Sequence, residues 1–186
     1  AIKRYLTTKA AQENFYKLVN KLNDSSLEET LAIYNTLKEK KVEPQVWAAL
    51  GLVDRFFLLA FTLGRRDMLH PWLFARCREV EKNPDNHLDL WARGHYKSTI
   101  ITYAGAIQAV LVNPEITIGI FSHTRPIAKS FLRQIKRELE GSEKLKQLYP
   151  DVCWTNEKRE APKWSEDDGI VVRRDSNPKE ATVEAW

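Results

Sequence analysis

The chain has 186 residues, of which 43% are hydrophobic and 29% are charged. This balance is typical of a globular protein and excludes a collagen-like, low-complexity or wholly disordered chain. No apolar run reaches the ~18–20 residues that cross a bilayer, and the first residues do not resemble a secretory signal. We therefore expect no membrane partner.

The charged residues are 29 lysines and arginines against 25 aspartates and glutamates, a net charge of +4. This weak positive balance allows a polyanionic partner without requiring one. The two cysteines, Cys77 and Cys153, are too few and too far apart to form a zinc site by themselves. We expect both to be buried, reduced thiols of a cytoplasmic protein.

The first 66 residues predict a helical N-terminal segment. Apolar residues recur at three- and four-residue steps through residues 10–22, which predicts one helix. Ser26 and Glu29 have the spacing of a capping box that opens a second helix. Pro44 suits the first turn of a third helix, which is apolar nearly all round and ends at Gly64.

Residues 67–186 predict a second domain of the α/β class. The expected helices cover residues 70–82, 100–112 and 126–140, with a short helical turn through Leu148, and the expected strands cover residues 87–92, 115–122, 169–174 and 181–186. From residue 87 the order is strand, turn, helix, strand, helix, which predicts a parallel sheet flanked by helices and joined by right-handed crossovers. A ligand is then expected where the first strand turns into its helix.

That turn holds a lysine and a hydroxyl, Lys97 and Ser98, at the start of the next helix. Such a pair can neutralise phosphate charge and ligate Mg²⁺. The usual phosphate-binding pattern has glycine at the positions that Trp91 and Tyr96 occupy here. From the residues alone, a nucleotide site and an ordinary basic loop with a solvated lysine both remain open.

Residues 91–99, with the sequence Trp-Ala-Arg-Gly-His-Tyr-Lys-Ser-Thr, resemble the deviant Walker A of the large terminase subunits of tailed bacteriophages. In that family an arginine lies four residues before the lysine, as Arg93 does here. Further segments resemble the family's second strand, its next helix and the exit from that helix; these are residues 119–124, 128–132, 148–151 and 164–165. The resemblance extends over residues 50–186.

The resemblance implies the N-terminal portion of a P-loop ATPase of the ASCE type, which binds ATP and Mg²⁺ to power the packaging of double-stranded DNA into a procapsid. The implied partners are DNA, the small terminase subunit, the portal protein and further copies of the chain in a ring. The implied location is the cytoplasm of the infected bacterial host, transiently at the capsid portal. The implied nucleotide-binding residues are Arg93, Gly94, His95, Tyr96, Lys97, Ser98 and Thr99, with catalytic roles for Arg93 and Lys97 and a metal-ligating hydroxyl on Ser98.

In the same family the acidic Walker B strand comes later than the last residue of this chain, Trp186. Asp167 and Asp168 precede a predicted strand instead of ending one, so they are poor substitutes. We therefore expect these 186 residues alone to bind ATP weakly and to hydrolyse it little or not at all.

The helix predicted over residues 126–140 has a basic face opposite its apolar stripe, which includes Arg125, Lys129 and Arg133. Such a face suits a nucleic-acid backbone, although a solvated charged face is common on any amphipathic helix. Residues 122–124 could sense a nucleotide or cap this helix. Two other functions remain open: a P-loop phosphotransferase acting on a small molecule, and a helical adaptor without catalytic activity.

Overall fold

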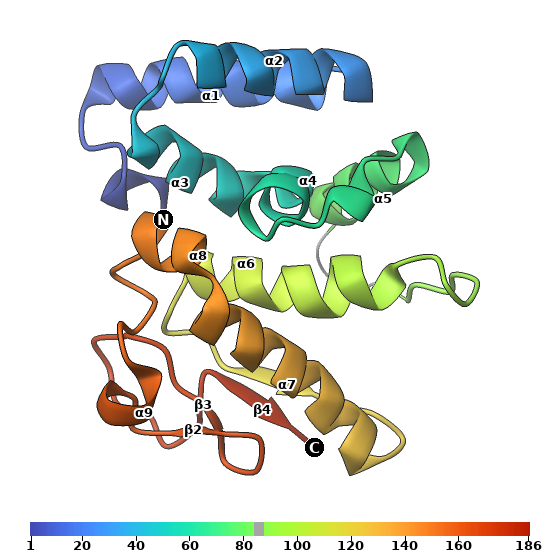
Figure 1. Cartoon of the computed structure of the whole chain (residues 1–186), viewed down its shortest axis with the longest axis vertical. Helices are drawn as coiled ribbons and strands as arrows, with labels where there is room; N and C mark the ends of the chain where they lie inside the picture. Colours follow the sequence, from blue (N-terminus) through green and yellow to red (C-terminus); the bar gives the residue numbers. More distant parts are fainter. Residues whose placement is uncertain (84–87) are drawn as a thin grey trace. The chain divides into compact units, whose positions relative to one another are not determined.

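The computed structural model describes residues 1–83 and 88–186, and these form two compact units, Ala1–Leu90 and Trp91–Trp186 (Figure 1). The first unit is helical. The second combines helices with a small mixed sheet of four strands. The predicted α/β class is therefore confirmed.

The first unit contains α1 (Lys9–Asn23), α2 (Leu27–Glu39), α3 (Pro44–Val53), α4 (Arg55–Phe57) and α5 (Pro71–Lys82), with the short segments η1 (Ile2–Arg4), η2 (Leu58–Thr62) and η3 (Arg66–Met68). The predicted capping box is confirmed, because the Ser26 hydroxyl accepts from the Glu29 N–H and the Glu29 carboxylate accepts from the Ser26 N–H. Pro44 begins α3 as expected. Gly64 follows η2 in a left-handed conformation, with φ of +69°.

The third predicted helix is not continuous, which corrects the sequence analysis. It breaks at Asp54, whose φ and ψ of −131° and 97° are extended. The Asp54 carboxylate then caps the next segment by accepting from the Phe57 N–H at 2.9 Å. Among the described residues no single helix is long and apolar enough to cross a membrane, and the pair Pro44–Val53 and Arg55–Thr62, which passes that test together, is bent by 113°.

Asp54 also lies at the centre of a buried polar cluster. Its carboxylate accepts hydrogen bonds from the Tyr34 hydroxyl of α2 and, at 3.0 Å, from the Arg78 guanidinium of α5. Glu81 of α5 accepts from the Arg55 N–H at 2.5 Å and lies 3.5 Å from Arg78. A buried charge is tolerated when it is paired and hydrogen-bonded, and the Asp54 carboxylate meets that condition, whereas the buried Nε of Arg78 has no hydrogen-bond partner among the described residues.

Aromatic rings surround the cluster. The ring of Phe57 stacks on that of Trp47 at 5.6 Å and meets Tyr34 edge to face at 5.2 Å. Phe56 meets Phe74 of α5 edge to face at 5.0 Å. Edge-to-face and offset pairs at these separations are favourable, so the bend at Asp54 is packed on both sides.

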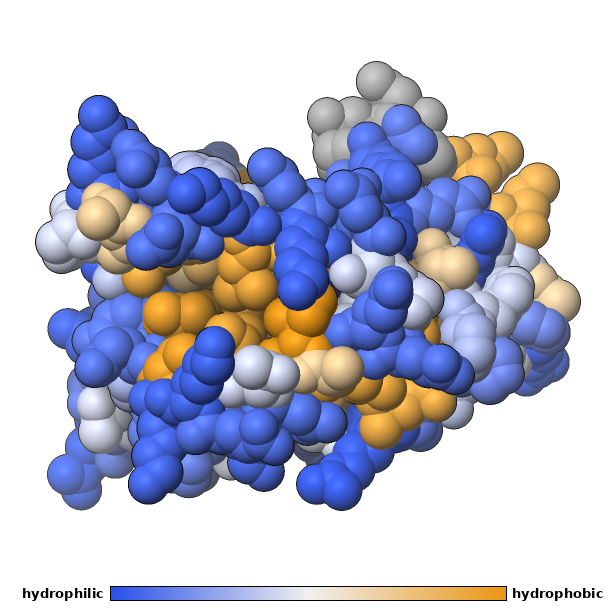
Figure 2. Space-filling model, turned by 90° about the horizontal axis from the view of Figure 1, so that it is seen from above, coloured by the Kyte–Doolittle hydropathy of each residue, from blue (hydrophilic) through white to orange (hydrophobic). Residues whose placement is uncertain are grey.

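The helices α1 and α2 leave part of their apolar surface uncovered. Figure 2, which shows the side of the molecule where these helices lie, has apolar side chains in a hollow bordered by polar ones. The groove between α1 and α2 has a volume of about 420 Å³ and includes the half-buried side chains of Leu18, Ile33 and Leu37.

The second unit contains the π-helical segment η4 (Ser98–Ala104), which continues into α6 (Gly105–Val112), then α7 (Arg125–Gly141), α8 (Glu143–Leu148) and α9 (Glu157–Glu160). Its strands are β1 (Ile118–Ile120), β2 (Trp164–Ser165), β3 (Gly169–Ile170) and β4 (Val183–Ala185). The helix α7 lies over β1 and β4 and buries Ala128, Leu132, Ile135 and Leu139 (Figure 1). These buried residues are spaced three and four apart, as the sequence predicts for its apolar stripe.

The sheet has the order β1-β4-β3-β2, and only part of it is parallel. The strands β1 and β4 pair in parallel, with Ile118 opposite Val183, whereas β3 pairs antiparallel with both β4 and β2. The prediction of a parallel sheet is therefore wrong: the sheet is mixed, and its one parallel pair among the described strands joins residues 118–120 to 183–185 and not to the strand predicted over residues 87–92. The short chain between β2 and β3 explains their antiparallel pairing, because two neighbouring strands joined by a tight turn run in opposite directions.

The strand predicted over residues 87–92 does not form within the part that the structure describes. Residues 88–92 have no regular structure, and Leu88 and Leu90 are 82% and 81% exposed; His87 lies outside the described residues. An alternating apolar pattern forms a strand only when a neighbour supplies hydrogen bonds and a surface to bury it. None of the four described strands pairs with this segment.

The division into units differs from the predicted boundary at residue 66. The helix α5 packs on α4, so it belongs to the first unit, and this unit continues to Leu90. Each unit contains one cysteine: Cys77 is in α5 and Cys153 follows α8. Both thiols are free and buried, as expected, and burial raises the pKa of each to about 12.

The cluster around Asp54 generates a prediction about stability. Replacing Asp54 with alanine leaves Tyr34 and Arg78 buried without their shared acceptor, and we expect the free energy of unfolding to fall by about 3–5 kcal/mol. The matched control is Asp67→Ala, which removes an ion pair with Arg65 whose side chains are 30% and 41% exposed. That change is expected to cost less than about 1 kcal/mol. Equal losses in urea denaturation of the two variants would contradict the prediction.

A second prediction concerns pH. Burial and the nearby Asp54 carboxylate raise the pKa of Glu81 from 4.5 to about 7, against the opposing effects of its hydrogen bond to Arg55 and the charges of Arg78 and Arg55. Between these values the folded state binds a proton that the unfolded chain has released, so stability falls as pH rises. We expect the free energy of unfolding to fall by about 2–3 kcal/mol more between pH 4.5 and 7.5 in the wild type than in Glu81→Gln.

The control for the pH prediction is Glu79→Gln, which lies on the same helix with an exposed carboxylate paired to Arg76. This variant should retain the pH dependence of the wild type. The measurement is urea denaturation of the three proteins at four pH values. If the free energy of unfolding of Glu81→Gln changed with pH as that of the wild type does, the prediction of a raised pKa for Glu81 would be wrong.

Candidate nucleotide site

The loop before η4 has two residues in the left-handed region. Gly94 has φ of +82° and Tyr96 has φ of +60°. The His95 N–H donates to the Ala92 carbonyl at 3.3 Å, and the His95 ring lies 3.1 Å from the Arg93 carbonyl through Nδ1. These contacts close a compact turn, from which Ser98 enters the helix directly.

Tyr96 is the unusual residue of this turn. Left-handed backbone costs a residue with a side chain about 1–2 kcal/mol, and such strain is found most often at functional sites. The usual phosphate-binding pattern places glycine at this position, and the observed φ explains why glycine suits it. Here the half-buried tyrosine adopts the glycine-like conformation.

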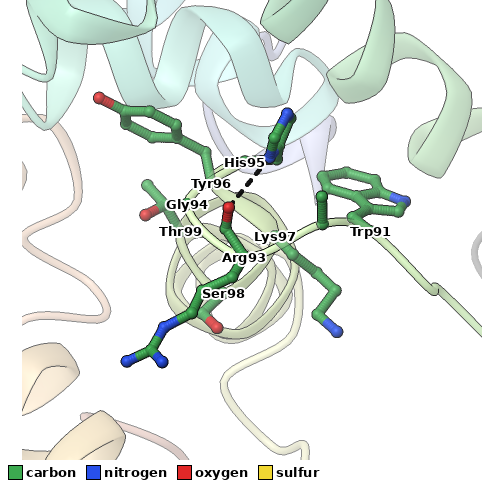
Figure 3. Close-up of a pocket in the computed structure, with 9 residues that line it drawn as sticks. Trp91, Arg93, Gly94, His95, Tyr96, Lys97, Ser98 and Thr99 are labelled. Atoms are coloured by element: carbon green, nitrogen blue, oxygen red, sulfur yellow. Dashed lines mark hydrogen bonds between the residues drawn. The ribbon is translucent and has the colours of Figure 1, made fainter.

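Residues 91–99 line a concave pocket with a volume of about 620 Å³, within the ordinary range for small-ligand sites. In Figure 3 the side chains of Arg93, Lys97 and Ser98 extend to one side of the loop, whereas those of His95 and Tyr96 extend to the opposite side. The three residues to which the sequence and the resemblance assigned phosphate and metal binding therefore extend to the same side of the loop, with the ends of Arg93 and Lys97 on either side of Ser98 (Figure 3). Thr99 follows in the first turn of the helix.

The charges on the side of the loop where Arg93, Lys97 and Ser98 extend favour binding of an anion. The lining residues include two permanent cations, Arg93 and Lys97, and no carboxylate. Ser98 and Thr99 lie in the first turn of the segment η4–α6, where backbone N–H groups have no partner within the helix and the helix dipole is positive. The arrangement can hold phosphate oxygens through backbone donors and two side-chain cations.

The donor set also limits which metal site is possible. Mg²⁺ in nucleotide sites is held by one or two protein oxygens together with waters and phosphate oxygens. The exposed Ser98 hydroxyl fits one such position. Over residues 1–83 and 88–186 no group of three His, Cys, Asp or Glu side chains is placed to hold a metal ion. The residues thus fit a metal shared with phosphate groups and do not form a protein-only metal site.

The other predicted site residues lie at the start of α7. Thr124 is its N-cap, but its side chain makes no capping hydrogen bond, and Ser122 and His123 precede it. Arg125, Lys129 and Arg133 lie four residues apart along α7, as expected. Each also contacts the turn between β2 and β3, which the sequence analysis did not anticipate.

The partners that sequence reasoning missed are Glu166 and Asp167, in the acidic run that ends at Gly169. An Asp-Gly pair at the start of a predicted strand is a signal for a hairpin turn, and here Gly169 is the first residue of β3. That signal places a turn at residues 166–168, but it does not indicate the helix on which the turn rests.

Comparisons of the chain with protein-family models, with curated proteins and with solved structures found no match.

The backbone of Tyr96 generates a prediction that does not depend on any ligand. Asparagine tolerates the left-handed conformation and valine does not, so we expect Tyr96→Val to be about 1–2 kcal/mol less stable than Tyr96→Asn. The same two substitutions at Tyr16, an exposed residue inside α1, provide the control, because valine and asparagine have similar helix propensities. Thermal unfolding of the four variants tests this, and an equal difference at both positions would contradict it.

Proposed function

We propose that residues 91–99 bind the phosphate groups of a nucleoside triphosphate. The observation that supports this most directly is that Arg93, Lys97 and Ser98 extend to one side of a loop that leads straight into a helix (Figure 3). A pocket of about 620 Å³ at that position, with two cations and no carboxylate in its lining, suits a polyphosphate.

The roles of the residues follow from the chemistry of phosphoryl transfer, in which positioning and charge stabilisation do most of the work. Lys97 neutralises charge on the terminal phosphates, and the N–H groups of the first helical turn orient their oxygens. The Ser98 hydroxyl would hold Mg²⁺ together with the phosphates, and the metal would supply neutralisation of the phosphate charge. Arg93, whose side chain extends to the same side of the loop, stabilises the charge that develops on the transferring group.

Hydrolysis also needs a carboxylate to orient water and to support the metal, and the described residues do not place one in the pocket lining. Asp167 is paired with Lys129, and Asp168 accepts from the Ser165 hydroxyl at 2.9 Å. Both belong to the turn between β2 and β3. We therefore propose that this chain binds ATP weakly and that efficient hydrolysis needs further residues of a longer protein.

The wider proposal follows from the resemblance of residues 91–99 to the terminase Walker A. We propose that the chain contributes the nucleotide-binding part of a DNA-packaging ATPase of the large terminase type. Its partners are then double-stranded DNA, the small terminase subunit, the portal protein and further copies of the same chain. The basic face of α7 is the surface that we propose for the DNA.

The test of nucleotide binding is calorimetry with Mg²⁺-ATP and with AMP. Lys97→Ala removes a charged hydrogen-bond donor, so we expect its affinity for ATP to fall by about 10-fold or more, while the weak affinity for AMP changes little. Lys17→Ala, at an exposed lysine of α1, is the matched control and should bind ATP as the wild type does.

Two outcomes would overturn the proposal. Unchanged ATP affinity in Lys97→Ala would show that the loop does not hold the phosphates. Failure of the wild type to bind any nucleotide, at concentrations up to the millimolar range, would favour the helical adaptor.

A further inference from the structure

The helix α7 carries a row of cations that we name the basic face: Arg125, Lys129 and Arg133. Residues four apart lie above one another on a helix, and each step advances about 6 Å along the axis. The basic face is therefore a row of three positive charges along α7, beside the buried stripe that packs on the sheet.

The turn between β2 and β3, residues 166–168, lies against this row and is named the acidic turn. Arg133 donates two parallel hydrogen bonds to the Glu166 carboxylate, at 2.7 and 2.6 Å. Lys129 pairs with the Asp167 carboxylate, and the Arg125 guanidinium donates to the Asp167 carbonyl at 3.5 Å. Every cation of the basic face thus has a partner in the acidic turn.

The hairpin fixes which side chains face α7. Gly169 has φ of +85°, and a Cβ there would lie 2.7 Å from the Val183 carbonyl oxygen, so the tight end of the turn requires glycine. Asp168 is held within the turn, because its N–H donates to the Ser165 hydroxyl and its carboxylate accepts from that hydroxyl. Glu166 and Asp167 are then the two carboxylates presented to the helix.

These contacts are partly exposed, unlike the buried cluster of the first unit. The side chains of Lys129 and Asp167 are 22% and 72% accessible, and those of Arg133 and Glu166 are 45% and 30% accessible. Hydrogen bonds from Arg133 and Lys129 lower the pKa of Glu166 and Asp167, so both carboxylates are charged at neutral pH. Exposed pairs of this kind contribute little to stability because solvent and salt screen them, and another anion can replace the carboxylates.

We propose that the basic face of α7 binds the phosphate backbone of double-stranded nucleic acid, and that the acidic turn is an internal competitor that occupies the same cations until nucleic acid displaces it. The geometry favours a backbone over a single phosphate, because the three cations form a line about 12 Å long on one helix. The proposal rests on the nucleic-acid partner of the proposed function but not on nucleotide binding at residues 91–99.

The competition has a measurable signature in the salt dependence. When a protein cation takes a phosphate, counterions leave the DNA, and affinity falls with added salt. If two protein carboxylates must first be released, they recruit cations from solution, so fewer ions are released overall. The wild type should therefore show weak binding with a shallow salt dependence. Removing the two carboxylates should strengthen both the affinity and its dependence on salt.

The experiment uses the chain with Glu166→Gln and Asp167→Asn, and a fluorescent duplex of about 20 base pairs, at several salt concentrations between 50 and 200 mM and without nucleotide. We expect the affinity to rise by about 5-fold at the lowest salt, and the slope of log affinity against log salt to steepen by about 1–2. The matched control is Glu13→Gln with Asp24→Asn, the same change of charge at exposed residues of the helical unit. The control should change the affinity by less than about 2-fold.

A further variant combines Glu166→Gln and Asp167→Asn with Lys129→Gln and Arg133→Gln. It should not show the increased affinity for the duplex, because two of the three cations are gone. Thermal unfolding checks that each variant is folded. If the double variant is not folded, Glu166→Gln alone replaces it, because this change weakens the two-bond contact with Arg133. The slope of log affinity against log salt should then steepen by about half as much.

Each contrary outcome identifies a different error. Equal affinity in the wild type, the double variant and the control would overturn the internal competition while leaving the nucleic-acid partner in place. Absence of duplex binding in all variants at the lowest salt would overturn the nucleic-acid partner, and the ATP calorimetry above would decide separately on residues 91–99. Stronger binding of the double variant to vesicles of anionic phospholipid than to the duplex would overturn nucleic acid as the ligand.

Discussion

The architecture of the helical unit depends on a single buried carboxylate. Asp54 is 2% exposed, and a charge at that depth requires partners from whatever surrounds it. Its partners come from three segments: the Tyr34 hydroxyl from α2, the Phe57 N–H from α4 and the Arg78 guanidinium from α5. Hydrogen bonds are directional whereas apolar packing is not, so these contacts determine how the three segments meet.

The second unit uses charge in the opposite way. Its helix α7 is held to β1 and β4 by buried apolar residues, including Leu132 and Ile135, which need no specific partner. The cations of its basic face pair with the turn between β2 and β3 in partly exposed contacts. Buried pairs resist exchange because separating them leaves charge without solvent, while exposed pairs exchange readily. The Asp54 cluster and the pairs between α7 and the acidic turn thus illustrate a structural and an exchangeable use of ion pairs.

Local signals in the sequence predicted much of this fold. The capping box at Ser26, the proline that opens α3 and the apolar stripe of α7 each depend on a few neighbouring residues, and all three are confirmed. The break at Asp54 was missed because a single polar residue in an apolar run also fits a continuous helix. Its extended conformation depends on Tyr34 and Arg78, which are 20 and 24 residues away.

The candidate site also shows that local patterns predict contacts between neighbouring residues but not contacts between residues far apart in the sequence. The residues that line its pocket are consecutive, so the sequence alone could bring Arg93, Lys97 and Ser98 together. The strand expected before them failed because a strand depends on a neighbour that no local pattern supplies. The pairs between α7 and the acidic turn join residues 33 and 38 positions apart, and their register depends on the packing of the hairpin.

The placement of the two cysteines has a practical consequence for studying this chain. A thiol reacts as thiolate, and burial with a raised pKa keeps both Cys77 and Cys153 inert while their surroundings stay intact. Because each unit contains one of them, the rate at which each thiol is alkylated in mild denaturant reports the opening of its own unit. Peptide mapping after alkylation would then resolve two local stabilities in one sample, with no label or tryptophan substitution introduced.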